Sequence, residues 1–217
     1  EHYRDPEGRF DLSRVERTGI TGDFNGAKLE ALFIGRHRET DFRMVEANLK
    51  QRSGGRRKKT RVVFSGLLVE VSVPVSFDGV VLLVGDKGAL GNWIVDWLRG
   101  SFEGIQPVSL EHGRFEERFQ VYSDRPDEAA RLLQPGLLDS LIAIAEELGE
   151  RAVNGAFIEG RFLIALPQRR NLFEIGGLHR SLEYAEDDLR RLAVEFTLPL
   201  RLIDTLHGER RPLMPEN

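Results

Sequence analysis

The sequence predicts an α+β fold, in which an antiparallel sheet built from hairpins is followed by a mixed helix–strand segment and a C-terminal helix. Three observations predict this class. Apolar and polar residues alternate in several segments of the N-terminal half, which is the two-residue period of a strand. Two-residue turn signals join such segments, which favours antiparallel neighbours. Beyond residue 125 the apolar residues recur at helical spacing instead.

Length and composition indicate a folded chain. It has 217 residues, of which 41% are hydrophobic and 30% are charged, and these fractions are typical of globular proteins. A chain of this length buries a sizeable core, as one large domain or two small ones. We predict a single α+β domain over residues 1–217, with its core at about 20–207 between a frayed polar N-terminus and a C-terminal tail.

Charge and cysteine content exclude several function classes. The net charge is −4 and the sequence pI is about 5.8, so no global basic field attracts nucleic acid or an anionic membrane. The absence of cysteine excludes disulfides, thiolate catalysis and cysteine-ligated metals. No run of about 18 apolar residues and no signal peptide is visible in the sequence. Because the chain begins at Glu1 rather than methionine, we interpret it as a fragment or as a chain trimmed at its N-terminus.

The first half of the chain supplies the strands of the predicted sheet. Residues 27–33 alternate apolar and polar side chains and predict a strand, and residues 42–49 predict a second strand from a weaker pattern. The range 50–61, with the sequence KQRSGGRRKKTR, has no apolar residue. Its composition predicts a loop.

Residues 67–77 carry the clearest strand pattern in the sequence. Their apolar side chains share one face, and their polar side chains, Glu70 among them, share the other. Pro74 has no ladder donor, so we expect this strand to lie at an edge or to carry a bulge there. Asp78-Gly79 is a two-residue hairpin signal that predicts a return strand over residues 80–84.

The middle of the chain mixes short helices and strands. Residues 89–99 are consistent with a short helix that has Trp93 and Trp97 on one face. Core packing is the simpler role for these two side chains, and an exposed aromatic platform for a partner is the alternative. A short strand is expected near residues 108–110.

A strand-to-helix unit follows. Residues 119–121 alternate as in a strand, Ser123 and Asp124 supply capping oxygens, and Pro126 fits a first helical turn. The next apolar residues recur at helical spacing: Leu137, Leu138, Leu141, Ile142 and Leu148. Gly149 is expected to end this helix as a C-cap.

The last third of the chain predicts a hairpin and a helix. Residues 152–158 and 162–166 are two apolar runs that flank the turn signal Glu159-Gly160. Residues 181–206 have helical spacing. We expect Pro199 to kink or split that helix, because proline lacks a donor and crowds the preceding turn.

A cluster of basic residues is the best candidate for a binding site. Seven cations fall within twelve residues without one acid: Lys50, Arg52, Arg56, Arg57, Lys58, Lys59 and Arg61. Such a cluster binds anionic lipid, at about 1 kcal/mol per basic residue near the surface, or a phosphate backbone with salt-dependent affinity. A solvated hairpin loop is the simplest alternative. No aromatic residues are interleaved to stack on single-stranded nucleic acid.

Other motifs favour structural roles. Gly85, Gly88 and Gly91 do not have the spacing of a dinucleotide fingerprint or a P-loop, so a turn is the simpler interpretation. The five histidines contain no pair at helical metal-ligand spacing. One alternative is that Glu111-His112 lies beside Glu116 in space, but a surface or singly hydrogen-bonded histidine is the simpler expectation.

The acidic and serine residues give no catalytic constellation either. Neighbouring carboxylates at 116–117, 146–147 and 186–188 point in different directions on a helix, so they are poor acid–base pairs and fit solvent faces. No serine lies in the strained elbow motif of a serine hydrolase. We expect no cofactor and no metal.

Three motifs resemble an uncharacterised bacterial family, the domain of unknown function 3137. They are Phe64-Ser65-Gly66-Leu67-Leu68 with the hairpin after it, the run from Phe115 and Phe119 through Val121-Tyr122-Ser123, Glu128-Ala129 and Leu132-Leu133 to Pro135, and Ile203-Asp204-x-Leu206. The resemblance spans about residues 20–207 and implies no catalytic residues. Some relatives have apolar membrane segments upstream, which implies a domain held near the bacterial inner membrane, although this chain contains no such segment.

These observations favour a non-catalytic interaction or scaffold domain at the cytoplasmic face of a bacterial membrane. The expected partners are an anionic membrane surface, bound through the basic range 50–61, or another protein. One alternative is an enzyme whose site is assembled from distant residues. The other is a nucleic-acid binder that uses the same basic range, which the acidic net charge makes the less favoured ligand class.

Overall fold

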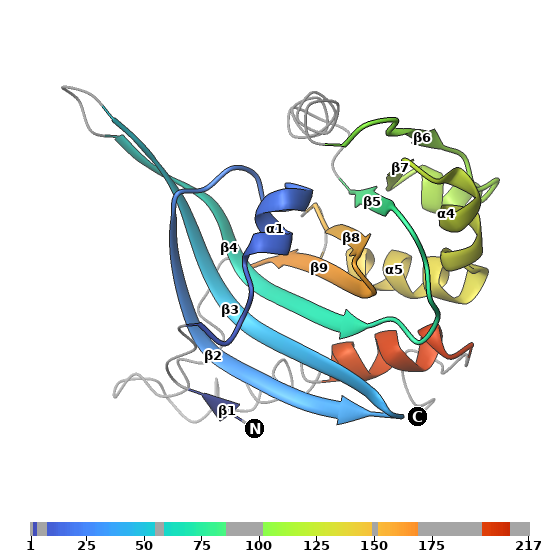
Figure 1. Ribbon diagram of the computed structural model, residues 1–217, viewed down its shortest axis with the longest axis horizontal. Coiled ribbons are helices and arrows are strands. Elements are labelled where there is room, and N and C mark those ends of the chain that lie inside the picture. Colours follow the sequence, from blue (N-terminus) through green and yellow to red (C-terminus); the bar gives the residue numbers. More distant parts are fainter. Residues whose placement is uncertain are drawn as a thin grey trace.

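An antiparallel sheet of nine strands organises the described part of the chain, in the spatial order β1-β2-β3-β4-β9-β8-β5-β7-β6 (Figure 1). The computed structural model describes residues 2–3, 8–54, 59–85, 102–148, 152–168 and 197–208. The strands are β1 (His2–Tyr3), β2 (Gly26–His37), β3 (Thr40–Ser53), β4 (Lys59–Ser72), β5 (Val80–Val84), β6 (Gln106–Val108), β7 (Gln120–Ser123), β8 (Asn154–Ile158) and β9 (Arg161–Pro167). The predicted α+β class is confirmed.

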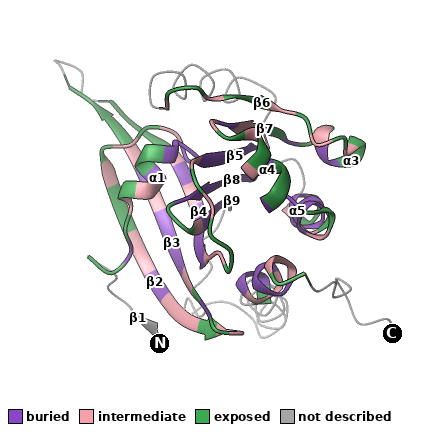
Figure 2. Ribbon diagram, turned by 45° about the vertical axis from the view of Figure 1, so that its right-hand side comes forward, coloured by how far each residue is buried: buried purple, intermediate pink, exposed green. Residues whose placement is uncertain are grey.

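Helices cover both faces of this sheet. They are α1 (Ser13–Thr18), α3 (Gly113–Glu116), α4 (Pro126–Leu132), α5 (Pro135–Leu148) and a C-terminal helix at 197–206. On one face α4, α5 and the C-terminal helix bury a core with Met44, Leu67 and Phe162. On the other face α1 and its flanking residues bury a second core with Val45 and Leu68. Figure 2 shows the buried stretches of the central strands lying between these two layers.

Two tight hairpins have two-residue turns in which both central residues have positive φ. Glu159 and Gly160 join β8 to β9 with φ of 50° and 69°. Arg38 and Glu39 join β2 to β3 with φ of 47° and 62°. Positive φ at both central residues matches the right-handed twist of the flanking strands. The predicted hairpin at Glu159-Gly160 is therefore confirmed.

The predicted hairpin at Asp78-Gly79 is wrong. β4 and β5 are not neighbours, because β9 and β8 lie between them in the sheet. The ladder of β4 ends at Ser72, two residues before Pro74, whose missing N–H cannot continue it. β4 pairs with β3 and β9 on its two sides, so the predicted edge position is also wrong.

The range 50–61 is not simply a loop. β3 continues to Ser53 and β4 begins at Lys59, and the two strands pair up to Ser53↔Lys59. Backbone pairing does not require apolar side chains where a hairpin extends past the core, so composition alone gives the wrong answer here. Figure 1 shows this hairpin projecting beyond the other strands.

The strand-to-helix unit is confirmed with one change. Pro126 occupies the first turn of α4, and the Ser123 hydroxyl accepts a hydrogen bond from the Arg125 amide at 2.9 Å. Neither Ser123 nor Asp124 caps α4, because its N-cap residue is Arg125 and no side chain makes a cap hydrogen bond there. The Asp124 carboxylate accepts a hydrogen bond from the Val80 amide at 2.7 Å, which ties the start of the helical segment to β5.

Several predicted features lie wholly or partly outside the described residues. The residues outside are the expected helix at 89–99 with Trp93 and Trp97, the cap at Gly149 and the range 181–196. Pro199 lies within the helical residues 197–206, and the kink or split expected there stays a prediction because residues 181–196 lie outside the described residues. Within the described ranges, no helix is both long enough and apolar enough to cross a membrane.

Candidate functional site

The end of the β3–β4 hairpin carries the predicted basic site. Residues 50–53 and 59–62 form a two-stranded segment, which we call the basic ribbon. Lys50 and Arg52 lie in β3, and Lys59 and Arg61 lie in β4. The remaining predicted site residues, Arg56, Arg57 and Lys58, lie outside the described residues. Four of the seven predicted cations are thus placed on one structural element.

The two strands divide these cations between two faces. Lys50 pairs with Val62 and Arg52 with Thr60, whereas Arg61 pairs with Gln51 and Lys59 with Ser53. Side chains of directly paired residues lie on the same face of an antiparallel ladder. Lys50, Arg52, Thr60 and Val62 therefore share one face, which we call the Val62 face. The opposite face carries Gln51, Ser53, Lys59 and Arg61.

Hydrogen bonds hold the base of the ribbon. The Asn25 side chain donates to the Arg52 carbonyl at 2.8 Å and accepts from the Arg52 amide at 2.8 Å. The Asn25 amide also donates to the Lys50 carbonyl at 3.0 Å. Beyond this point β2 offers no further pairs, since its ladder with β3 starts at Gly26↔Lys50. The ribbon thus leaves the sheet from a fixed base.

The basic ribbon is exposed and electrostatically unbalanced. All its residues except the half-buried Lys50 are exposed, and the Val62 side chain is 50% exposed. Within the described ranges, no carboxylate lies within ion-pair distance of Lys50, Arg52, Lys59 or Arg61. Other arginines do pair with acids, as Arg114 does with Glu146 at 3.5 Å. The positive charge of the basic ribbon is therefore available to an external anion.

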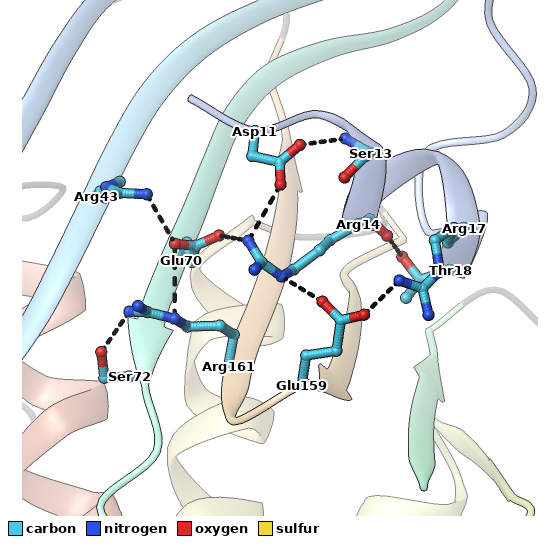
Figure 3. Close-up of polar contacts among 10 residues, drawn as sticks. All are labelled: Asp11, Ser13, Arg14, Arg17, Thr18, Arg43, Glu70, Ser72, Glu159 and Arg161. Atoms are coloured by element: carbon cyan, nitrogen blue, oxygen red, sulfur yellow. Dashed lines mark hydrogen bonds and ion pairs between the residues drawn. The ribbon is translucent and has the colours of Figure 1, made fainter. Parts of the chain in front are cut away.

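A second cluster of charges surrounds Glu70 (Figure 3). Only 1% of the Glu70 side chain is exposed, and its carboxylate faces Arg14 at 3.5 Å, Arg43 at 3.5 Å and Arg161 at 4.0 Å. Arg161 also donates to the Ser72 hydroxyl. Sequence reasoning placed Glu70 on a polar face and missed this cluster, because its members come from distant parts of the chain.

Glu159 extends the cluster to the surface. Its carboxylate pairs with Arg14 at 2.9 Å and with Arg17, so α1 is bound to the β8–β9 turn. The hydrogen bond from Arg17, aided by Arg14, holds the pKa of Glu159 below its ordinary value. The Asp11 carboxylate accepts from the Ser13 amide at 2.9 Å, and hydrogen bonds from Ser13 lower its pKa. Asp11, Glu70 and Glu159 are all paired with arginine. This arrangement indicates a structural role for the cluster.

A third polar cluster seats the C-terminal helix. The buried carboxylate of Asp204 meets the Nε2 of His37 and the Nε of Arg38, both at 2.7 Å. Thr40 and the Nε2 of His207 are 2.9 Å apart. The helix is thereby fixed to the tip of the β2–β3 hairpin. Asp204 belongs to the motif Ile203-Asp204-x-Leu206. Its role there is to hold the C-terminal helix in place through His37 and Arg38.

The remaining histidine candidate, at Glu111-His112, is also structural. The His112 ring accepts from the Phe115 amide at 3.3 Å and so begins α3. Glu116 accepts from the Ser109 hydroxyl and the Leu110 amide, both at 2.8 Å. These bonds lower the pKa of Glu116, with a smaller contribution from His112. Across the described residues, no three His, Asp or Glu side chains converge as metal ligands.

The glycine motif is only partly described. Gly85 lies at the end of β5, where an added Cβ would collide with the Val153 carbonyl. Its amide donates to the Asn154 side chain at 3.0 Å. Glycine at position 85 therefore allows the backbone to lie close to that of Val153. Gly88 and Gly91 lie outside the described residues.

Comparison with known proteins places the chain in a family. The chain is similar to a solved structure, the crystal structure of the mycobacterial trehalose monomycolate transport factor A, TtfA. The TM-score is 0.43 and the sequence identity is 12%, and the match covers 99% of this chain and 88% of that chain. No curated protein matches. The family described as protein of unknown function (DUF3137) matches residues 62–207, more than half of the chain. The chain therefore belongs to the DUF3137 family.

Proposed function

We propose that this chain is a non-catalytic interaction domain that binds an anionic membrane surface through the basic ribbon. One observation carries the proposal: four exposed or half-exposed cations project on a two-stranded element without a carboxylate partner among the described residues. Each basic residue near an anionic bilayer contributes about 1 kcal/mol. The sequence places Arg56, Arg57 and Lys58 between the two strands, and the proposal includes them.

The net charge of the whole chain supports a local interaction. The chain as a whole has a net charge of −4, so a distant anionic surface repels most of the domain and attracts only the ribbon. Attraction at one projecting element orients the domain, because screening limits such forces to about 8 Å at physiological salt. The domain would then dock with its ribbon toward the lipid and the bulk of its acids away from it.

The same chemistry favours a location for this binding. The cytoplasmic leaflet is the one whose anionic lipids attract basic segments. We therefore propose the cytoplasmic face of a bacterial membrane as the place where the domain acts, with the sheet and its helices folding as one scaffold domain behind the ribbon.

The test compares two variants with the same net charge. In the ribbon variant Lys50, Arg52, Lys59 and Arg61 are all changed to Gln. In the control variant the exposed residues Arg36, Arg114, Arg118 and Arg125 are changed to Gln instead. Binding is measured by sedimentation with vesicles that contain phosphatidylserine and with neutral phosphatidylcholine vesicles.

We expect the unmodified chain and the control variant to bind the anionic vesicles, and the ribbon variant to lose most of that binding. Equal losses in both variants would mean that net charge alone matters. An unmodified chain that ignores anionic vesicles at low salt would end the proposal. Tighter binding to a random DNA duplex, with a steep dependence on salt, would favour the nucleic-acid alternative.

A further inference from the structure

The two faces of the basic ribbon differ in one apolar side chain. Val62 is 50% exposed and is one of two large hydrophobic residues that are exposed in the described ranges; the other is Val75. Val62 lies directly opposite Lys50 in the ladder, with Arg52 two residues further along β3. One face of the ribbon therefore combines an exposed apolar group with two cations, whereas the face of Gln51 and Arg61 is entirely polar.

We propose that the ribbon enters the bilayer boundary with the Val62 face, and this inference rests on the membrane binding proposed above. Val62 leaves water for the region between the headgroups and the acyl chains. Lys50 and Arg52 keep their charges at the headgroups while their aliphatic stems lie along the apolar boundary. Charge and apolar burial act on the same face, so they add.

The base of the ribbon supports a defined orientation. Asn25 fixes both backbone groups of Arg52, and the Arg52 guanidinium lies against Gly26, where a Cβ would be 3.3 Å from the Arg52 Nε. A ribbon that is already ordered loses little conformational entropy on binding. The lower part of the Val62 face is thus presented in a fixed direction relative to the sheet.

The absence of cysteine from the chain allows a direct test with single labels. Val62→Cys reports on the Val62 face, Gln51→Cys on the opposite face, and Val75→Cys lies beyond the other end of β4. Each variant carries an environment-sensitive fluorophore and is mixed with phosphatidylserine vesicles, with and without lipids that carry a quencher on the acyl chain. We expect a blue shift and quenching at position 62, and unchanged spectra at positions 51 and 75.

A second measurement avoids a bulky label. Val62→Thr keeps the branched shape of the side chain and replaces one of its two methyl groups with a hydroxyl, and Val75→Thr is the matched control. We expect Val62→Thr to weaken vesicle binding about three- to fivefold, from the loss of about half a valine of apolar burial. The control should leave binding unchanged.

Charge variants complete the comparison of faces. Lys50→Gln with Arg52→Gln and Lys59→Gln with Arg61→Gln each remove two charges, so charge alone predicts equal losses. We expect the larger loss for the first pair. If all labels stay unshifted while anionic vesicles still bind, or if the two pairs lose equally, the inference fails and the proposed function stands. If the unmodified chain binds no vesicles, the proposed function itself fails.

Discussion

His37 and Asp204 are 167 residues apart in the chain, yet the Nε2 of one lies 2.7 Å from the Oδ1 of the other. Arg38 reaches the same carboxylate oxygen at 2.7 Å. The buried Asp204 therefore takes two partners from the tip of the β2–β3 hairpin, and through them the C-terminal helix is fixed against the strands that lead to the basic ribbon.

Asp204→Asn should detach that helix in part. The amide keeps the shape of the carboxylate but loses its charge, and a hydrogen bond to a charged group contributes about 1.5–3 kcal/mol. We expect a loss of that size in urea unfolding, and faster hydrogen exchange in residues 197–206. Asp139→Asn, at an exposed carboxylate 3.7 Å from His112, is the control. Equal stabilities of the two variants would contradict the role given to Asp204.

Glu70→Gln should be among the most destabilising isosteric changes. Its carboxylate is buried and faces the guanidinium groups of Arg14, Arg43 and Arg161. Removing one partner of such a cluster leaves uncompensated charge and costs about 3 kcal/mol. The control is Glu147→Gln, which breaks an exposed pair with Arg201 and should cost about 1 kcal/mol at most. Chemical unfolding measures both, and similar costs would show that the Glu70 cluster is weakly coupled.

The sequence predicts elements whose signals are local. The hairpin at Glu159-Gly160 and the helix after Pro135 follow from turn chemistry and apolar spacing over a few residues. The partners of β4 do not follow, because β9 lies about a hundred residues away and its pairing depends on the whole sheet. No signal in Asp78-Gly79 distinguishes a hairpin from a crossing to another part of the sheet.

In the candidate site, too, the sequence predicts local features but not those that depend on the whole sheet. Counting charges locates the basic ribbon, but composition predicts a loop where paired strands divide the cations between two faces. The ladder places Val62 opposite Lys50 on one face of the ribbon, and the sequence alone does not predict this position. Glu70 reads as one polar residue of a strand face, and its burial depends on Arg14 and Arg161, which no local pattern connects to it.

Acid should weaken the attachment of α1 to the β8–β9 turn. Hydrogen bonds from Arg17 and Arg14 hold the pKa of Glu159 below its ordinary value of 4.5. A carboxylate with a lowered folded pKa adds stability above its unfolded pKa, and that stability is lost as pH falls through the folded value. We therefore expect the free energy of unfolding to decline below about pH 4.5.

The contribution of Glu159 to that decline is small, since the group is exposed and solvent screens it. Glu159→Gln should flatten the pH profile slightly below that value while leaving its upper part unchanged in slope. Urea unfolding across the acid range measures both curves. If the profile of the variant stays parallel to that of the unmodified chain, Glu159 does not contribute to the loss of stability in acid.

Gly66→Ala should disrupt the join between β4 and β9. Gly66 has a φ of 156° and pairs with Pro167, and an added Cβ would collide with the Leu166 carbonyl and lie 2.8 Å from the Gln168 amide. Both obstacles are backbone atoms, so relief requires a shift of the strand, and we expect a loss of about 2 kcal/mol or more. The matched change is Gly113→Ala, where a Cβ would meet nothing within 4 Å and alanine should be neutral or slightly stabilising. Thermal unfolding of both variants compares them directly. A Gly66→Ala variant as stable as Gly113→Ala would mean that the close approach of β4 and β9 does not require glycine.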